Sequence, residues 1–131
     1  KKFDIYHCHF GKIANKYLPG AVTLVLPATG AVPVHVNSCD RSTVGIRIPN
    51  QSIALEILAE TGPLATTSAN RSGEPPLETM SAIANAFPEV LTLDCDKLEL
   101  DKKIGSGMPS TVVKWTDREW QILRQGIIAF S

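Results

Sequence analysis

The chain has 131 residues, enough for one domain of common size with a buried core. Lysine and arginine together number 13, as do aspartate and glutamate, so no global field attracts nucleic acid or an anionic membrane, and any polyanion site must be local. Hydrophobic residues make up 44% of the chain, but no apolar run reaches the roughly 20 residues that span a bilayer, and no signal peptide is visible. The three cysteines, Cys8, Cys39 and Cys95, form no CxxC pair, which favours reduced thiols in a cytoplasmic protein.

The beginning of the chain predicts a helix followed by two strand-like segments. Apolar residues between Phe10 and Leu18 recur with helical spacing, and the Pro-Gly pair that follows them ends the helix. The run Val22–Leu26 is almost wholly apolar and predicts a strand buried on both faces. The next alternating segment, residues 32–36, contains Pro33 and is therefore expected to be an edge strand or an irregular stretch.

The segment Thr43–Ile48 predicts a strand whose two faces differ in chemistry. Its alternation places Val44 and the two isoleucines on one face, which we expect to lie in the core. The other face carries a hydroxyl, an empty position and a guanidinium, from Thr43, Gly45 and Arg47. Glycine inside a strand is unfavourable unless another group must approach the backbone closely. This face is either a floor above which an anion can lie, or an exposed arginine beside a glycine at a bend.

Next in chain order we expect a helix capped by Asn50 and ended by Gly62-Pro63, and then a strand at Pro63–Ser68. A second helix is expected from Met80 to Phe87, capped by Thr79, followed by a strand at Val90–Leu93. The last element is a hairpin of Ser110–Trp115 with Glu119–Arg124. Strands and helices interleave with strand pairs, so the predicted class is α/β or α+β around a twisted mixed sheet. No internal repeat or linker divides the sequence. We therefore predict one domain over residues 1–131.

The stretch from Pro63 to Pro76, P-L-A-T-T-S-A-N-R-S-G-E-P-P, changes from an apolar pattern to small polar residues and a turn. Ligands in α/β sheets tend to bind at the carboxyl ends of strands. Ser68 and Asn70 are therefore candidate binding residues, and the alternative is a strand followed by an ordinary turn.

Other predicted strands end in similar groups. Thr43 and Arg47 belong to one strand, Ser110 follows a glycine-rich loop that enters another, and Arg124 precedes Gln125-Gly126. Hydroxyls, backbone N–H groups and guanidinium forks suit carboxylate and phosphate oxygens. Together these residues predict a pocket for a small anion or for a nucleotide held without a glycine-rich phosphate loop.

Several common kinds of site are absent from the sequence. His7-Cys8-His9 has no further Asp, Glu, Cys or His at ligand spacing, so no metal site is predicted there. There is no Gly-x-Ser-x-Gly nucleophile elbow, no Walker A loop and no GxGxxG fingerprint. No catalytic residue is identified from the pattern alone.

Five motifs carry a family resemblance: L-P-G-A-V-T-L-V-L-P (Leu18 to Pro27), V-G-I-R-I-P (Val44 to Pro49), T-S-A-N-R-S-G (Thr67 to Gly73), P-S-T-V-V (Pro109 to Val113) and I-L-R-Q-G (Ile122 to Gly126). In this order and spacing the chain resembles the YrdC-like family. Its best-known members are the threonylcarbamoyl-AMP synthases of tRNA modification. The motifs span nearly the whole chain.

The resemblance implies an α/β fold, a twisted mixed sheet with flanking helices and a positively charged cavity. It implies a nucleotidyltransferase that converts L-threonine, bicarbonate and ATP to threonylcarbamoyl-AMP and pyrophosphate, with Mg²⁺ expected beside ATP. The product would serve the t6A transfer machinery, which modifies A37 of tRNA in the cytoplasm. By motif, four residues resemble the family's ATP-contacting positions: Thr43, Asn70, Thr79 and Arg124. Three others resemble the positions that hold threonine or its carbamate: Arg47, Ser68 and Ser110.

The sequence departs from the family pattern at its beginning. Family members carry an N-terminal strand and a Lys-x-Arg-Pro motif whose cations lie over the phosphates, and Lys1-Lys2 is not that motif. We therefore expect a partial, N-terminally incomplete domain of low synthase activity on its own, because charge neutralisation carries much of phosphate chemistry. The alternatives are a non-catalytic module that binds double-stranded RNA or tRNA, and a relative that adenylates another carbamate.

Overall fold

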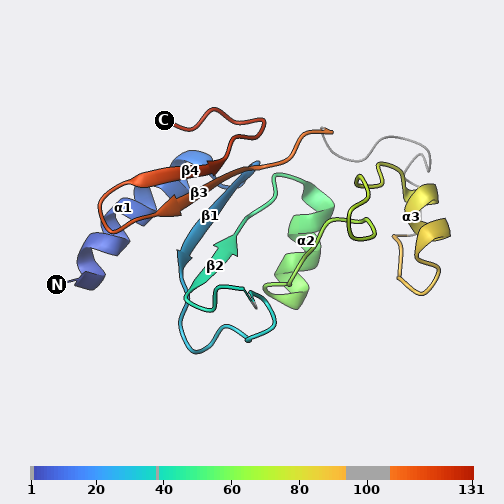
Figure 1. Ribbon diagram of the computed structural model, residues 1–131, viewed down its shortest axis with the longest axis horizontal. Helices are drawn as coiled ribbons and strands as arrows, with labels where there is room; N and C mark the ends of the chain where they lie inside the picture. Colours follow the sequence, from blue (N-terminus) through green and yellow to red (C-terminus); the bar gives the residue numbers. More distant parts are fainter. Residues whose placement is uncertain (1, 38, 94–106) are drawn as a thin grey trace. The chain divides into compact units, whose positions relative to one another are not determined.

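The protein is described by a computed structural model, which covers residues 2–37, 39–93 and 107–131 (Figure 1). The chain forms two compact units. The first unit consists of Lys1–Ala65 and Pro109–Ser131, and the second of Thr66–Met108.

The first unit is built on a mixed sheet of four strands in the order β2-β1-β3-β4 (Figure 1). The strands are β1 (Val22–Pro27), β2 (Thr43–Ile46), β3 (Thr111–Trp115) and β4 (Trp120–Arg124). β1 runs parallel to β3, while β2 pairs antiparallel with β1 and β4 antiparallel with β3. The predicted mixed sheet is therefore confirmed. Its central pair joins strands that are far apart in the sequence.

The core of the first unit lies between this sheet and helix α1 (Lys2–Tyr17). Val22, Leu24 and Val113 are fully buried, and α1 packs Phe10 and Ile13 against them. Residues of β1 alternate between buried and half-buried positions, so only one of its faces is fully buried. The prediction of burial on both faces was wrong, because apolar residues on the second face of a strand need a covering layer to be buried.

The β3–β4 hairpin is confirmed, with an irregular register near its end. Val113 pairs with Ile122, whereas its neighbour Val112 pairs with Arg124, so one extra residue is accommodated in β4. Such a bulge re-aims the side chains next to it. Here the bulge lies directly beside Arg124.

The helices follow the expected pattern with one change of cap. Helix α2 (Ser52–Thr61) is capped by Gln51, whose Oε1 accepts a hydrogen bond from the Ala54 N–H, and not by Asn50 as predicted. The cap has moved because the helix begins one residue later than the sequence suggested, which leaves Gln51 in the extended conformation that an N-cap requires. Helix α3 (Met80–Ala86), in the second unit, is capped by Thr79 as predicted.

Two predicted strands are absent, because Pro63–Ser68 and Val90–Leu93 have no regular structure. Neither segment is hydrogen-bonded to a neighbouring strand in the sheet. β-propensity alone does not make a strand, since the backbone groups of a strand need a partner. Residues 32–36 contain turns, the irregular option that Pro33 suggested.

The predicted core face of the segment Thr43–Ile48 is not buried. β2 ends at Ile46, and Ile46 and Ile48 are 39% and 42% exposed, whereas Thr43 is only 9% exposed. The cause is the position of β2 at the edge of the sheet, where only its β1 side is paired. The hydroxyl-bearing Thr43, and not the aliphatic face, is the buried part of this strand.

Candidate functional site

The closest contact between predicted site residues joins Ser110 to Arg124. Ser110 directly precedes β3 and is 8% exposed, and Arg124 is the last residue of the neighbouring strand β4. The Nε and Nη2 groups of Arg124 donate to the carbonyl oxygen of Ser110 at 3.2 and 2.9 Å. Nη2 also reaches Ser110 Oγ at 3.2 Å. The guanidinium is thereby fixed against the serine.

Thr23 is a third member of this group that sequence reasoning missed. Its Oγ1 lies 2.9 Å from Ser110 Oγ, because β1 and β3 are parallel neighbours and bring the two residues to the same part of the sheet. The available signal was a single hydroxyl in the apolar run V-T-L-V-L. We call Thr23, Ser110 and Arg124 the donor corner.

The hydrogen bonds of the donor corner suit an anionic ligand. A hydroxyl oxygen has one proton to donate and two lone pairs to accept. Arg124 donates to Ser110 Oγ, and Thr23 can donate to its other lone pair, which leaves the Ser110 proton for a ligand. Arg124 also keeps the two N–H groups of Nη1, for which the described residues supply no acceptor. The corner can therefore present O–H and N–H donors to a carboxylate or phosphate.

The donor corner rests on a tightly packed backbone crossing. Thr111, which is fully buried, donates to the Ile128 carbonyl at 2.6 Å and accepts from the Gly126 N–H at 3.0 Å. A Cβ on Gly126 would overlap backbone atoms of Pro109, Ser110 and Thr111. Because Gly126 has no side chain, the chain can pass directly over the start of β3.

Arg47 is placed apart from the donor corner, just beyond the end of β2. Its Nε donates to the carbonyl oxygen of Gly20 at 3.2 Å, and the Gly20 N–H donates to the carbonyl of Ile48 at 2.8 Å. Gly20 cannot carry a side chain here, since a Cβ would lie 2.5 Å from the Tyr17 carbonyl oxygen. The exposed guanidinium of Arg47 is oriented by the turn before β1. It makes no direct contact with Ser110 or Arg124 among the residues that the structure describes.

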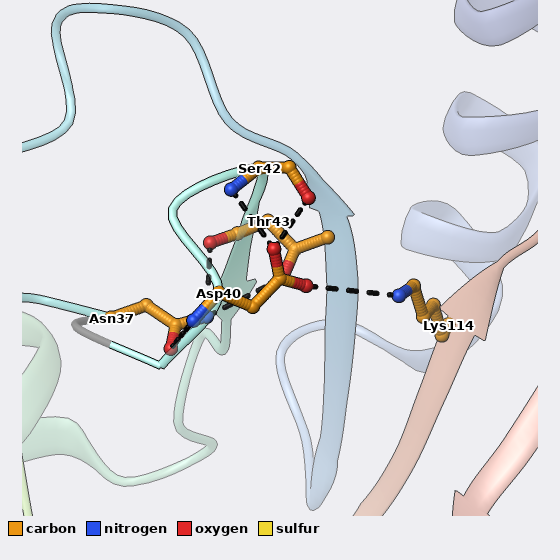
Figure 2. A network of polar contacts seen from close by, with 5 residues as sticks. All are labelled: Asn37, Asp40, Ser42, Thr43 and Lys114. Atoms are coloured by element: carbon orange, nitrogen blue, oxygen red, sulfur yellow. Dashed lines mark hydrogen bonds and ion pairs between the residues drawn. The ribbon is translucent and has the colours of Figure 1, made fainter.

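Thr43, at the start of β2, belongs to a separate polar network (Figure 2). Its Oγ1 donates to Asp40 Oδ2 at 2.9 Å and accepts from Asn37 Nδ2 at 3.3 Å. Asp40 Oδ1 also accepts from the backbone N–H and the hydroxyl of Ser42, at 3.0 and 2.5 Å. Asp40 and Asn37 had not been predicted, because they lie in a polar loop that shows no periodicity.

These contacts set the charge state of Asp40. The hydroxyl of Ser42, then that of Thr43, then the Ser42 N–H lower the pKa of the Asp40 carboxyl, because all of them donate to the ionised form. The attraction of Lys114 on β3 lowers the same pKa further by a small amount, since its Nζ is 3.9 Å from Asp40 Oδ2 and both side chains are exposed to solvent. Asp40 is therefore an ionised carboxylate that accepts hydrogen bonds at neutral pH.

Thr43 also lines a hollow of about 260 Å³ beside this network. We call it the loop pocket, because most of its wall comes from the segment between β1 and β2. Its lining includes Thr29, Val32, Val34, Asn37, Arg41 and Thr43. The Arg41 guanidinium has no polar partner in the described part of the chain. An apolar wall, a hydroxyl and a free cation thus meet in one cavity.

In the second unit, the segment around Asn70 forms a turn held by its own side chain. Asn70 Nδ2 donates to the carbonyl oxygens of Arg71 and Glu74 at 2.9 and 3.0 Å, and the Asn70 N–H donates to the Ser68 carbonyl. These bonds fix which side of the amide is oxygen. Asn70 Oδ1 is buried and has no partner among the described residues. An unsatisfied buried acceptor is costly, which fits a position that meets a donor on a ligand.

Thr79, the remaining predicted site residue, has a visible structural task. Its Oγ1 accepts from the Ala82 N–H at 3.2 Å as the N-cap of α3. Arg71 supports the other end of that helix, donating to the Ala86 carbonyl at 3.2 Å with its guanidinium over the Phe87 ring. Among the predicted residues of the second unit, Asn70 is therefore the one whose side chain has a buried atom without a partner in the described part of the chain.

The described residues contain neither a cluster of metal ligands nor a membrane-spanning helix. No group of three or more His, Cys, Asp and Glu side chains lies close enough to hold a metal ion there. The side chains of His7, Cys8 and His9 lie outside the described residues. No described helix combines the length and the apolar character needed to cross a membrane.

Comparison with known families matches residues 5–126 to the Sua5/YciO/YrdC model, whose description reads "Telomere recombination". The chain belongs to the Sua5/YciO/YrdC family. The motifs containing Ser110, Arg124 and Asn70 lie inside the matched region. The YrdC-like resemblance drawn from the sequence is thus confirmed.

Individual members of the Sua5/YciO/YrdC family support this assignment. A protein of Methanocaldococcus jannaschii is 34% identical over 122 residues, which make up 89% of this chain and 52% of that protein. The threonylcarbamoyl-AMP synthase of Pyrococcus abyssi is 33% identical over 115 residues, 87% of this chain and 32% of the synthase. The chain thus spans about half, or less, of the length of the relatives that it matches.

Solved structures of the same family share the fold. P. abyssi Sua5 complexed with L-threonine superimposes with a TM-score of 0.72 at 30% identity, over 90% of this chain and 34% of that one. E. coli YciO gives a TM-score of 0.66 at 25% identity, over 90% of this chain and 55% of its own. The YrdC-like fold predicted from the motifs is confirmed.

Proposed function

We propose that this chain is part of an L-threonylcarbamoyladenylate synthase, which forms threonylcarbamoyl-AMP and pyrophosphate from L-threonine, bicarbonate and ATP. Relatives named threonylcarbamoyl-AMP synthase support the reaction class, and the neighbouring Sua5 structure with L-threonine supports threonine as a substrate. The product would then be used for N6-threonylcarbamoylation of A37 in tRNA.

The observation that carries the proposal is the contact between Ser110 and Arg124. By motif, Ser110 belongs to the threonine side of the site and Arg124 to the ATP side. The reaction joins the two substrates, so residues from the two sides must meet where the new bond forms. The guanidinium and hydroxyl groups of the donor corner lie within 3.2 Å of each other, as this requires.

The chemistry needs positioning and charge neutralisation more than a covalent intermediate. The amine of threonine takes up CO₂ or bicarbonate to form a carbamate. A carbamate oxygen then attacks the α-phosphorus of ATP, and the bond from that phosphorus to the β-bridging oxygen breaks as pyrophosphate leaves. The Ser110 O–H and the free Arg124 N–H groups would hold the oxygens that gain or carry negative charge.

The other predicted residues are assigned by the same proposal. Arg47 and Ser68 would hold threonine or its carbamate, and Thr43, Asn70 and Thr79 would contact ATP. Mg²⁺ is expected to accompany ATP. The described residues offer no carboxylate cluster that fits the ion, so the protein's part in catalysis is assigned to its own cations and hydroxyls.

The test is pyrophosphate release by the complete protein that contains this chain, with ATP and bicarbonate and with or without threonine. We expect release that depends on threonine and that falls in a Ser110→Ala variant. A Ser52→Ala variant, at the exposed first residue of α2 and outside the predicted site, serves as the control. Release that does not depend on threonine contradicts the proposed function. Full activity in a folded Arg47→Ala or Ser110→Ala protein contradicts the site assignment.

A further inference from the structure

The direction of the hydrogen bonds at Thr43 is fixed by its neighbours. An ionised carboxylate can only accept, so the 2.9 Å contact between Thr43 Oγ1 and Asp40 Oδ2 uses the threonine proton. Asn37 Nδ2 donates to Thr43 Oγ1 at 3.3 Å and so occupies one lone pair. One lone pair remains. Toward a ligand, the Thr43 hydroxyl is therefore an acceptor and not a donor.

The amide of Asn37 cannot be turned around to change this result. Its Oδ1 accepts from the backbone N–H of Asp40 at 3.2 Å, and its Nδ2 donates to the Thr43 carbonyl oxygen at 3.2 Å. Exchanging the nitrogen and the oxygen would place two donors together at one end and two acceptors at the other. Figure 2 shows the side chains of Asn37, Asp40 and Thr43 joined in this network.

The loop pocket offers three kinds of contact within one cavity. Val32 and Val34 provide an apolar wall, Arg41 provides a cation that has no partner among the described residues, and Thr43 provides the acceptor. The volume of about 260 Å³ is slightly below the roughly 300–1,000 Å³ of pockets that hold drug-sized ligands. It suits the nucleoside portion of a nucleotide, which has an apolar base and donor groups, with the phosphates attached at one end of the sugar.

We propose that Asp40 and Asn37 are positioning residues that make Thr43 the acceptor for a hydrogen-bond donor of the nucleoside in the loop pocket. The donor is a ribose hydroxyl or an exocyclic amine, and it is not a phosphate oxygen, since phosphate oxygens only accept at neutral pH. This inference rests on the proposed function, because it takes the nucleotide of that reaction as the ligand.

The experiment measures the affinity of the protein for ATP and three analogues by calorimetry. 2′-Deoxy-ATP and 3′-deoxy-ATP each lack one ribose hydroxyl, and purine riboside triphosphate lacks the exocyclic amine. We expect one analogue to bind about fivefold more weakly than ATP, the effect of losing a neutral hydrogen bond. That analogue identifies the group that donates to Thr43.

Two variants test the roles of the hydroxyl and of Asp40. Thr43→Val should lower ATP affinity to that of the identified analogue and leave the affinity of the analogue unchanged. In Asp40→Asn, the amide oxygen keeps the two Ser42 contacts at the Oδ1 position, so Nδ2 faces Thr43 as a donor. Thr43 would then turn its proton toward the ligand, and the preference for ATP over that analogue should disappear.

Thr61→Val is the matched control, because Thr61 is an exposed threonine at the end of α2, where its hydroxyl bonds to the Ile57 carbonyl. It should leave all affinities as they are. Equal affinity for ATP and every analogue overturns the inference while the proposed function stands. The inference is also overturned, with the proposed function intact, if the Asp40→Asn or the Thr43→Val protein prefers ATP over the analogue as strongly as the wild type does. Failure to bind any nucleotide contradicts the proposed function and the inference with it.

Discussion

The donor corner and the loop pocket both present a hydroxyl at an end of a strand, but their neighbours give these hydroxyls opposite tasks. Ser110 Oγ accepts from Arg124 and bonds to the Thr23 hydroxyl, which can act as the donor and so leave the Ser110 proton available. Thr43 lies between an acceptor, Asp40, and a donor, Asn37, so its lone pair is available. The same functional group is thus prepared for an anion in one place and for a donor in the other.

The two regions also differ in how firmly they are held. The donor corner lies over the fully buried Thr111 and a glycine that permits close backbone contact. The loop pocket is built from an irregular segment, and its carboxylate is partly exposed. Changes at the corner should therefore affect stability and chemistry together. Changes in the pocket should mainly affect which ligand is preferred.

The largest expected effect comes from removing the cation of the corner. Arg124→Ala should reduce threonine-dependent pyrophosphate release by roughly 10²–10³-fold, because it removes a charge stabiliser and the group that orients Ser110. Arg124→Lys should recover little, since an ammonium cannot reproduce the fork that bonds to both oxygens of Ser110. Arg118→Ala, in the exposed turn of the hairpin, is the control and should retain activity. A folded Arg124→Ala protein with full activity would show that the donor corner takes no part in the reaction.

The next effect concerns the support of the corner. Gly126→Ala places a Cβ against the backbone of Pro109 to Thr111 and should lower the free energy of unfolding by about 1–3 kcal/mol or more. Urea unfolding followed by circular dichroism measures the change. Gly11→Ala, in α1 with no atom near the added Cβ, is the matched control and should stabilise by up to about 1 kcal/mol. Equal effects of the two substitutions would mean that the crossing is not tightly packed.

The smallest expected effect concerns the charge of Asp40, in the polar network beside the loop pocket. The folded pKa of Asp40 is lowered, so its contribution to stability is present above its ordinary pKa and is lost as the pH falls through the lowered value. Ser42→Ala should raise this pKa most, because the Ser42 hydroxyl is the largest cause of the shift, and Lys114→Ala should raise it least. Carboxyl NMR titration gives the values. The reverse order would show that charge attraction, and not hydrogen bonding, keeps Asp40 ionised.

Local sequence patterns predicted the elements whose burial depends on their own periodicity. The helical spacing around Phe10 and Ile13, the apolar run of β1 and the turn between β3 and β4 all correspond to observed elements. Ser110 and Arg124, two of the predicted site residues, are in contact because they lie at ends of adjacent strands. These are features that neighbouring residues in the chain determine.

The failures depend on partners that are distant in sequence. Pro63–Ser68 has strand-like composition but no strand to pair with, and the aliphatic face of β2 is exposed because β2 lies at the sheet edge. Asp40 and Asn37 were missed because they lie in a polar loop. Such a loop has no hydrophobic periodicity that would indicate which side chains meet or which of them donate. Thr23 was missed because its task depends on Ser110, 87 residues later.

The central claim is that Ser110 serves an anion as a donor and Thr43 serves a nucleoside as an acceptor. The most direct measurement is calorimetric binding of L-threonine and of ATP to two variants, Ser110→Ala and Thr43→Val. The account predicts a crossed result, in which Ser110→Ala weakens L-threonine binding more than ATP binding and Thr43→Val weakens only ATP binding. Equal weakening of both ligands by both variants would contradict it.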